Sequence, residues 1–99
     1  MQVEISPSVR PDKKFQAVIN NKKTIHFGSK GASDFTLHKD NERKRKYEGR
    51  HRKREDWTDP NTAGFYAKNI LWNKPTVAGS IKDTNLRFKG LHIYYKKSA

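Results

Sequence analysis

The residues of this chain that could do chemistry are cations, and eight of them lie in one stretch, Asp40–Asp56 (DNERKRKYEGRHRKRED). Arginine offers a planar fork of N–H donors that pairs with a phosphate or a carboxylate, and lysine offers a compact positive charge. Cations gathered in this way favour a polyanionic partner, either nucleic acid or an acidic protein surface. The candidate residues for polyanion or partner binding are Arg43, Lys44, Arg45, Lys46, Arg50, Arg52, Lys53 and Arg54.

Two other interpretations of this stretch stay open. Three acids each precede a cation by four residues, a spacing that stabilises a helix and would leave a solvated, internally paired face. The pairs are Asp40 with Lys44, Glu42 with Lys46, and Glu48 with Arg52. The runs Arg43–Lys46 and Arg50–Arg54 also resemble a bipartite nuclear localisation signal. Binding is the first hypothesis, because five interleaved acids still leave the segment clearly cationic.

The other reactive residue types show no catalytic or metal-binding pattern. His38-Lys39-Asp40 has the residue types of the phospholipase D signature, but they are contiguous and single, whereas that motif is His-x-Lys-x4-Asp and occurs as a pair. The four histidines lack the spacing of metal ligands, and the absence of cysteine excludes disulfides and thiolate sites. Gly28–Gly31 lacks the Walker spacing and predicts a plain linker. We therefore expect no enzyme activity, no metal and no cofactor.

Four large aromatic residues follow the basic stretch and could stack on nucleic-acid bases. Their near-helical spacing beside Ile70 and Leu71 favours packing in the core instead. The candidate core or interface aromatics are Trp57, Phe65, Tyr66 and Trp72.

The elements that must position these residues form a single small basic domain of α+β class over residues 1–99. Residues 1–33 are predicted to be a β region, with a short strand at Val3–Ile5 followed by a β-hairpin or small antiparallel sheet. The hairpin turn is expected at Asn20-Asn21, because asparagine tolerates the positive φ that tight turns require.

Residues 34–57 are predicted to form one long basic helix, in which Gly49 is an unfavourable residue. Its N-cap is expected at Ser33, Asp34 or Thr36, or at Asp40 if the helix begins later. At 100° per residue Leu37, Tyr47 and His51 fall on one narrow side of this helix, while the cations occur at every angle around it. The helix is therefore expected to bury little.

Residues 58–99 are predicted to hold two shorter helices and a short C-terminal strand. The first helix covers the apolar window 61–72, and the second begins at Thr76, a residue type favoured at the N-cap. The strand is expected at Leu91–Tyr95.

The net charge of +12 is spread over the whole chain, and more of it lies outside the basic stretch than inside it. Leu, Ile, Val and Phe supply about a fifth of the residues, near the level at which a highly charged chain becomes disordered. A thin core is expected, firmer inside an assembly than alone. No apolar run has the ~20 residues of a membrane span, and the first residues lack the apolar core of a signal peptide.

Five short segments of the chain form an ordered string of motifs. They are Gly31–Asp40, Arg52–Trp57, Asn61–Phe65, Leu71–Thr76 and Ser80–Asn85. This string resembles a family of small basic proteins of giant nucleocytoplasmic double-stranded DNA viruses that infect algae and amoebae. The resemblance covers roughly residues 28–88 and implies a viral product, packaged in the virion and without enzyme activity.

We therefore expect a virion structural protein, a minor capsid or cement-type component whose basic residues bridge acidic capsid surfaces. Interleaved acids and cations on all sides of the helix favour this interpretation over contact with DNA. The expected partners are capsid or other virion proteins with acidic surfaces in a larger assembly. The expected location is the virion, and the host cytoplasm or nucleus during assembly. The alternative is a sequence-nonspecific DNA-binding or genome-packaging protein.

Overall fold

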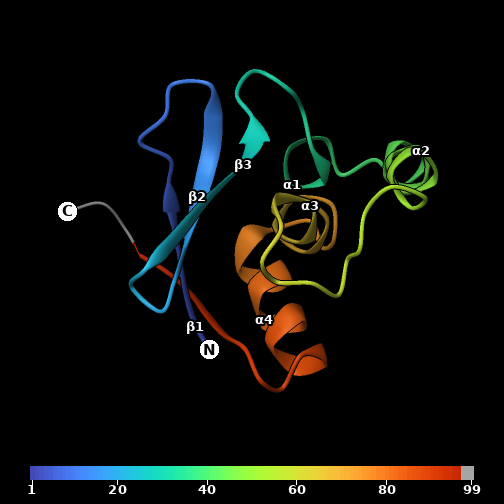
Figure 1. The fold of residues 1–99 in the computed structure, drawn as a ribbon. Helices are drawn as coiled ribbons and strands as arrows, with labels where there is room; N and C mark the ends of the chain where they lie inside the picture. The colour runs from blue at the N-terminus through green and yellow to red at the C-terminus, as the bar shows by residue number, and fades with distance from the viewer. Residues whose placement is uncertain (97–99) are drawn as a thin grey trace.

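A four-stranded sheet forms one layer of the molecule, and the helices cover one of its faces (Figure 1). The computed structural model describes residues 1–96. The strand order is β3-β2-β1-β4, with β1, β2 and β3 antiparallel and β4 parallel to β1. The predicted α+β class, N-terminal antiparallel sheet and C-terminal strand are confirmed. The strands are β1 (Gln2–Pro7), β2 (Lys13–Ile19), β3 (Lys23–Ser29) and β4 (His92–Tyr95).

The predicted hairpin turn lies between β2 and β3. Asn20 and Asn21 take φ values of 51° and 59°, and the Lys22 amide donates to the Ile19 carbonyl at 3.0 Å. Positive φ at both central residues matches the right-handed twist of the flanking strands. Asparagine accepts this conformation more readily than other non-glycine residues, so the sequence determines the turn locally.

The core lies between the sheet and the helices. Apolar residues alternate along each strand, and the register places Val3 opposite Ile19 on β2 and Ile93 on β4. One face of the sheet is therefore apolar and the other is polar. The side chains that form the core cluster are Val3, Ile5, Ala17, Ile19, Ile25, Phe27, Phe65, Tyr66, Ile70, Leu71, Ile81 and Ile93.

The helical layer is built from short elements. Thr62 and Thr76 accept amide hydrogen bonds with their side chains and cap α3 and α4 respectively, as predicted for Thr76. The predicted helix over 61–72 is present, but its second half is a π-helical turn. Among the described residues, no helix has both the length and the apolar character to cross a membrane. The elements are α3 (Ala63–Tyr66), the π-helix η1 (Ala67–Leu71) and α4 (Val77–Arg87).

The prediction of one long basic helix over residues 34–57 is wrong. The structure divides this region into α1 (Phe35–His38), α2 (Asn41–His51) and an irregular segment. Lys39 takes the left-handed conformation at φ 56°, and its amide closes α1 on the Phe35 carbonyl at 3.0 Å. Asp40 is extended and begins a new helix as its N-cap, the position predicted for a helix that begins later. Helix α1 therefore ends at Lys39 instead of continuing into α2, because a residue in the left-handed conformation cannot extend a right-handed helix. Leu37 lies in α1 and is exposed, so it does not share a side of α2 with Tyr47 and His51.

Candidate functional site

Helix α2 carries the basic stretch and lies at the outer edge of the helical layer, away from the sheet (Figure 1). Four of its side chains contact other parts of the described chain: Lys44, Tyr47, Glu48 and His51. This spacing of three, one and three residues places the four side chains on one side of a helix with 3.6 residues per turn. These four residues are called the inner stripe.

The centre of the inner stripe is a stack of aromatic rings. Tyr47 is the buried residue of α2, and its ring lies parallel to Trp72 at 4.3 Å between centroids. His51 stacks on Tyr47 at 4.2 Å. Burial raises the pKa of the Tyr47 hydroxyl, and the nearby Glu55 carboxylate adds to the shift. A helix with one buried side chain is thus held by ring stacking rather than by a broad apolar face.

Two polar contacts flank the stack. The Lys44 ammonium donates to the Asn73 carbonyl at 2.7 Å and lies 5.0 Å from the centre of the Phe35 ring. Burial lowers the pKa of Lys44. Glu48 pairs with Lys68 of η1 at 3.1 Å, and the stacked Trp72 is the residue that caps the end of η1. Lys44 therefore anchors α2, in contrast to the other seven cations predicted to bind a partner.

The acids of the basic stretch mostly bond to groups other than its cations. Of the three predicted pairs four residues apart, only Glu42 with Lys46 forms, at 3.7 Å. Asp40 instead accepts the amides at the start of α2, and Glu48 pairs with Lys68. The solvated face with internal pairing that the spacing allowed is therefore largely absent from the described residues.

The last two acids of the stretch serve the segment after α2. Glu55 accepts from the Trp57 indole at 2.9 Å and lies 3.3 Å from Nδ1 of His51. Asp56 accepts from the Thr58 amide and hydroxyl, and these hydrogen bonds lower the pKa of the Asp56 carboxyl. Four of the five acids are thus engaged in caps, turns or contacts with the rest of the fold.

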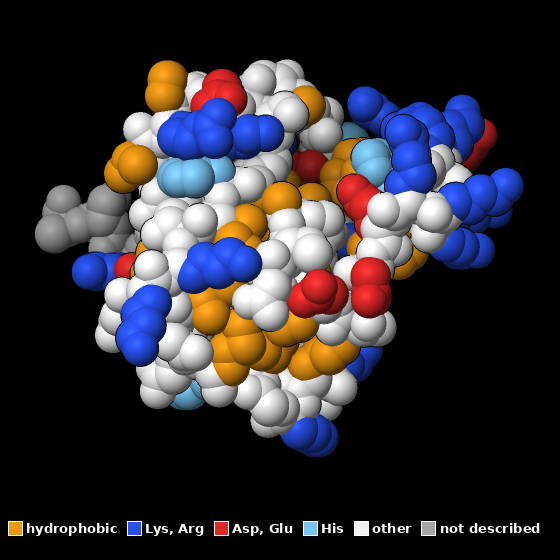
Figure 2. Space-filling view, in the orientation of Figure 1, with side chains coloured by type: hydrophobic (Ala, Val, Ile, Leu, Met, Phe, Trp, Pro, Cys, Tyr) orange, Lys and Arg blue, Asp and Glu red, His pale blue; other side chains and the backbone are white. Residues whose placement is uncertain are grey.

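The result is a strongly cationic outer surface formed by α2 and the turn that follows it, on which Glu42 is an exposed acid. All seven remaining candidate cations are exposed, and within residues 1–96 only Lys46 among them makes an ion pair. Figure 2 shows Lys and Arg gathered at the position of α2. This surface, called the cationic face, consists of Arg43, Arg45, Lys46, Arg50, Arg52, Lys53 and Arg54.

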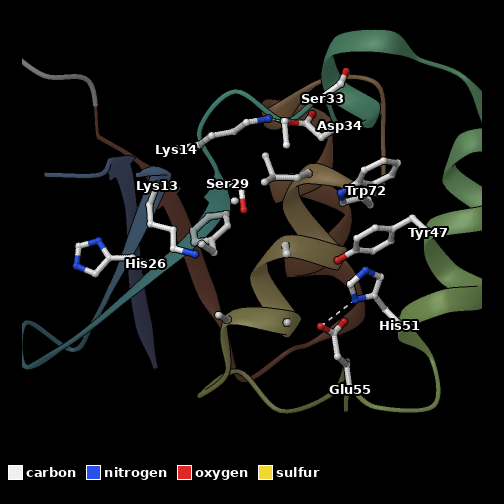
Figure 3. Close-up of a pocket in the computed structure, with 17 residues that line it drawn as sticks. Lys13, Lys14, His26, Ser29, Ser33, Asp34, Tyr47, His51, Glu55 and Trp72 are labelled. Atoms are coloured by element: carbon white, nitrogen blue, oxygen red, sulfur yellow. Dashed lines mark hydrogen bonds and ion pairs between the residues drawn. The ribbon is translucent and has the colours of Figure 1, made fainter. Parts of the chain in front are cut away.

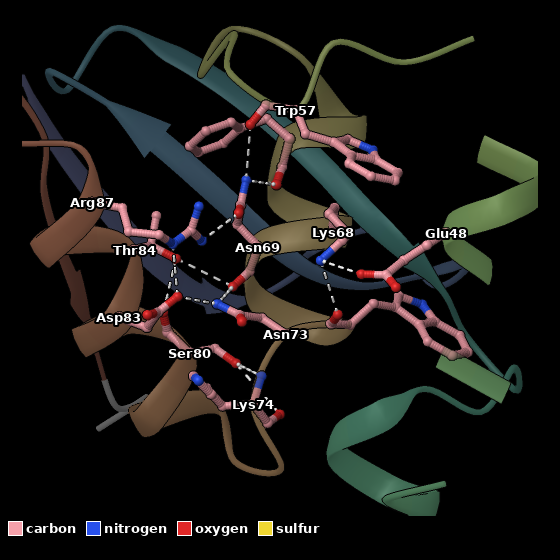
Figure 4. A network of polar contacts seen from close by, with 12 residues as sticks. Glu48, Trp57, Lys68, Asn69, Asn73, Lys74, Ser80, Asp83, Thr84 and Arg87 are labelled. Atoms are coloured by element: carbon pink, nitrogen blue, oxygen red, sulfur yellow. Dashed lines mark hydrogen bonds and ion pairs between the residues drawn. The ribbon is translucent and has the colours of Figure 1, made fainter. Parts of the chain in front are cut away.

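A buried polar network supports the element to which α2 is anchored (Figure 4). Asn73 donates to the Asn69 carbonyl at 3.1 Å and to Asp83 at 2.8 Å, and Arg87 donates to the Asn69 side chain at 2.7 Å. The Asn73 hydrogen bond, aided by Arg87, lowers the pKa of Asp83. This network was not predicted from the sequence, although its asparagines stand four residues apart, as do Asp83 and Arg87.

An open groove of about 440 Å³ lies between the end of β3, α2 and α3 (Figure 3). Gly28, Gly64 and Ala67 are small residues along its wall. Its charged groups mostly pair with one another, as Lys14 does with Asp34 and His51 with Glu55. The groove therefore lacks the single strong charge of the cationic face beside it.

The structure places the four candidate aromatics in different settings. Phe65 and Tyr66 are fully buried in the core. Trp72 is half-buried and stacks on Tyr47. Trp57 is half-buried, and the Lys68 ammonium lies 5.3 Å from the centre of its ring. Within the described residues these rings support α2 and the core, and the cationic face contains no aromatic side chain.

Comparison with protein families shows that residues 3–51 are similar to a family of unknown function (DUF5754). The similar region covers most of β1, all of β2 and β3, and the helices α1 and α2, and it ends before α3, α4 and β4. Neither the curated proteins nor the solved structures contain a match to this chain. The resemblance to proteins of giant viruses stays a prediction.

Proposed function

We propose that this protein is a non-enzymatic nucleic-acid-binding protein whose cationic face docks on the phosphate backbone without reading its sequence. The observation that carries the proposal is the separation of charge on α2. Four of the five acids of the basic stretch bond to caps, turns or other parts of the fold, while seven cations are exposed and Glu42 alone of those acids pairs with one of them. Such an excess of positive charge matches a partner of uniform negative charge, which duplex nucleic acid provides at ~1.7 Å intervals.

The sequence favoured acidic proteins over nucleic acid as the partner, and this arrangement of charges favours nucleic acid. In the sequence, the acids interleaved with the cations favoured a partner with charges of both signs, such as an acidic protein surface that also carries some cations. Because those acids are engaged elsewhere, the exposed surface is more uniform than the sequence suggested. The eleven residues of α2 span about 16 Å, and a helix of ordinary diameter fits the ~12 Å major groove.

Lack of sequence preference follows from the side chains themselves. Among residues 1–96 the cationic face is built from long side chains, and no hydrogen bond to the rest of the protein fixes their ends, apart from the Lys46 ion pair. Such groups neutralise phosphates in many positions, whereas reading a base requires a donor held in one geometry.

The test is binding to duplex DNA of unrelated sequences as a function of salt. The logarithm of the affinity should fall with the logarithm of salt at a slope near −0.9 per phosphate contacted, reaching about −6 if all seven cations engage. The variant Arg45→Glu/Arg52→Glu should bind at least about tenfold more weakly at low salt.

A matched control separates the cationic face from bulk charge. Lys82 and Lys89 are exposed and lie outside α2. The variant Lys82→Glu/Lys89→Glu changes the net charge by the same amount, and it should bind within about threefold of wild type. Equal weakening by both variants, or no binding of wild type at low salt, would contradict the proposal.

A second candidate function is the virion structural role implied by the resemblance to giant-virus proteins. The specific observation in its favour is the polar outer face of the sheet, which the helices leave uncovered (Figure 1). In this proposal the protein is a minor capsid or cement-type component whose partners present acidic surfaces. Mass spectrometry of purified particles tests it: a copy number matching capsid symmetry supports the role, and absence from particles rejects it.

A further inference from the structure

Gly49 stands on the exposed side of α2, in its last turn, where the fold itself gives no reason for a glycine. Its φ is not positive, and a Cβ added there meets no described atom within 4 Å. The other two helical glycines differ. A Cβ added at Gly64 would lie 2.9 Å from the Glu55 side chain, and a Cβ added at Gly79 would lie 2.9 Å from the Thr76 side chain. Glycine in a helix interior is less stable than alanine, so this residue costs stability without solving a local packing problem.

The neighbours of Gly49 on the helix surface are all cations. Residues three and four positions away are the closest on a helix surface, and here they are Arg45, Lys46, Arg52 and Lys53. Arg52 still has right-handed helical dihedrals, and its amide closes the helix on the Glu48 carbonyl at 2.9 Å, with Lys53 in the turn that follows.

Gly49 also points away from the rest of the molecule. Gly49 is two positions from Tyr47 and two positions from His51, and each step of two positions turns the helix by 200°. Because Tyr47 and His51 form the inner stripe, Gly49 faces outward, in the centre of the cationic face. The one position of this surface without a side chain is therefore surrounded by four positive charges.

We propose that Gly49 is the point where the sugar-phosphate backbone lies directly against α2, with its phosphates held by the four surrounding cations. This inference deepens the proposed function and rests on it. Glycine is the residue that allows a ligand to approach a protein backbone closely. A closer approach shortens every distance between cation and phosphate, and the attraction grows as the inverse of that distance.

The position of Gly49 near the C-terminal end of α2 does not oppose this contact. The helix dipole places about half a negative charge at that end. Four full positive charges surround the residue, so the local field still favours an anion. The contact is steric and electrostatic, since the amide of Gly49 lies within the helix.

The experiment compares Gly49→Ala and Gly49→Gln with wild type, using a duplex DNA of mixed sequence at low salt. Both variants should melt at a higher temperature than wild type, because both residues favour a helix more than glycine does. Affinity should move in the opposite direction, falling by about threefold with alanine and by about tenfold or more with glutamine.

The matched control is Gly90→Gln. Gly90 is exposed, lies outside α2, and a Cβ added there also meets no described atom within 4 Å. This control should bind DNA as wild type does. If wild type binds and Gly49→Gln binds equally tightly with its helix content retained, this inference is overturned while the proposed function stands. If wild type itself does not bind, the proposed function fails, and this inference fails with it.

Discussion

Helices α2 and α4 have the same length of eleven residues and use their polar side chains in opposite ways. On α4 several polar residues turn inward, where Ser80 and Thr84 are buried and Asp83 joins a network with Asn73 (Figure 4). On α2 most of the polar residues are cations that turn outward (Figure 2). The difference teaches that polarity alone does not identify a binding surface.

Pairing within the protein is what separates the two helices. A buried polar group that lacks a partner destabilises the fold, so the polar side chains of α4 must find partners in the protein. An exposed cation without a protein partner has no such role, and its removal should leave the fold unchanged. The same contrast divides α2 itself into its inner stripe and its cationic face.

The largest expected effect comes from breaking the inner stripe at its centre. Tyr47→Ala removes the buried residue of α2 together with both ring stacks. The free energy of unfolding should fall by about 3 kcal/mol, because a large buried ring is lost and a cavity remains. Urea denaturation measures the loss, and hydrogen exchange should show α2 opening more readily.

The matched change on the other side of α2 is Arg45→Ala. The stability of this variant should lie within about 0.5 kcal/mol of wild type, since Arg45 is exposed and makes no ion pair within the described residues. Similar losses for Tyr47→Ala and Arg45→Ala would mean that α2 does not have the two sides described here.

Local signals in the sequence were sufficient for much of the fold. Alternating apolar residues predicted the strands, Asn20-Asn21 predicted the hairpin turn, and Thr76 predicted the start of α4. The parallel pairing of β4 with β1 was not predicted, because nothing local in the sequence sets which strands pair across the whole chain. The break at Lys39 was missed because left-handed geometry at a lysine has no clear residue signal.

The candidate site was predicted in outline but not in its orientation. The sequence located the cations and the helix, yet it could not tell which acids would pair with them. The spacing of four residues predicted an ion pair between Glu48 and Arg52, whereas in the folded protein Glu48 forms an ion pair with Lys68. Spacing of three and four from Tyr47 to Lys44 and His51 was the available signal for the inner stripe.

A smaller effect sharpens the comparison with two lysines of the same helix. Lys44→Met should destabilise the protein by about 1–2 kcal/mol, because the Asn73 carbonyl loses its donor, and should leave the salt slope of DNA binding unchanged. Lys46→Met should leave stability within about 0.5 kcal/mol of wild type and make the salt slope shallower by about one. Calorimetry and salt titration measure both. The two sides of α2 would lose their distinction if Lys44→Met changed the salt slope and Lys46→Met did not.

The smallest expected effect concerns pH and the inward polar residues of α4. The pKa of Asp83 is lowered in the folded protein from its ordinary value of 3.8, chiefly by the Asn73 hydrogen bond and then by Arg87. A lowered folded pKa means that the ionised carboxylate stabilises the fold above the ordinary value, and that this contribution is lost as pH falls through the folded pKa. Stability should therefore decline from about pH 4 downward, and Asp83→Asn should decline less steeply over the same range while being less stable at pH 7. Chemical denaturation at pH 3, 5 and 7 measures the difference.

Arg54→Gln, a change of similar size on the cationic face, should shift the free energy of unfolding at all three pH values by the same small amount. If Asp83→Asn kept the full acid dependence of wild type, the network behind α2 would not depend on a charged Asp83, and α4 would resemble the cationic face more than the geometry indicates.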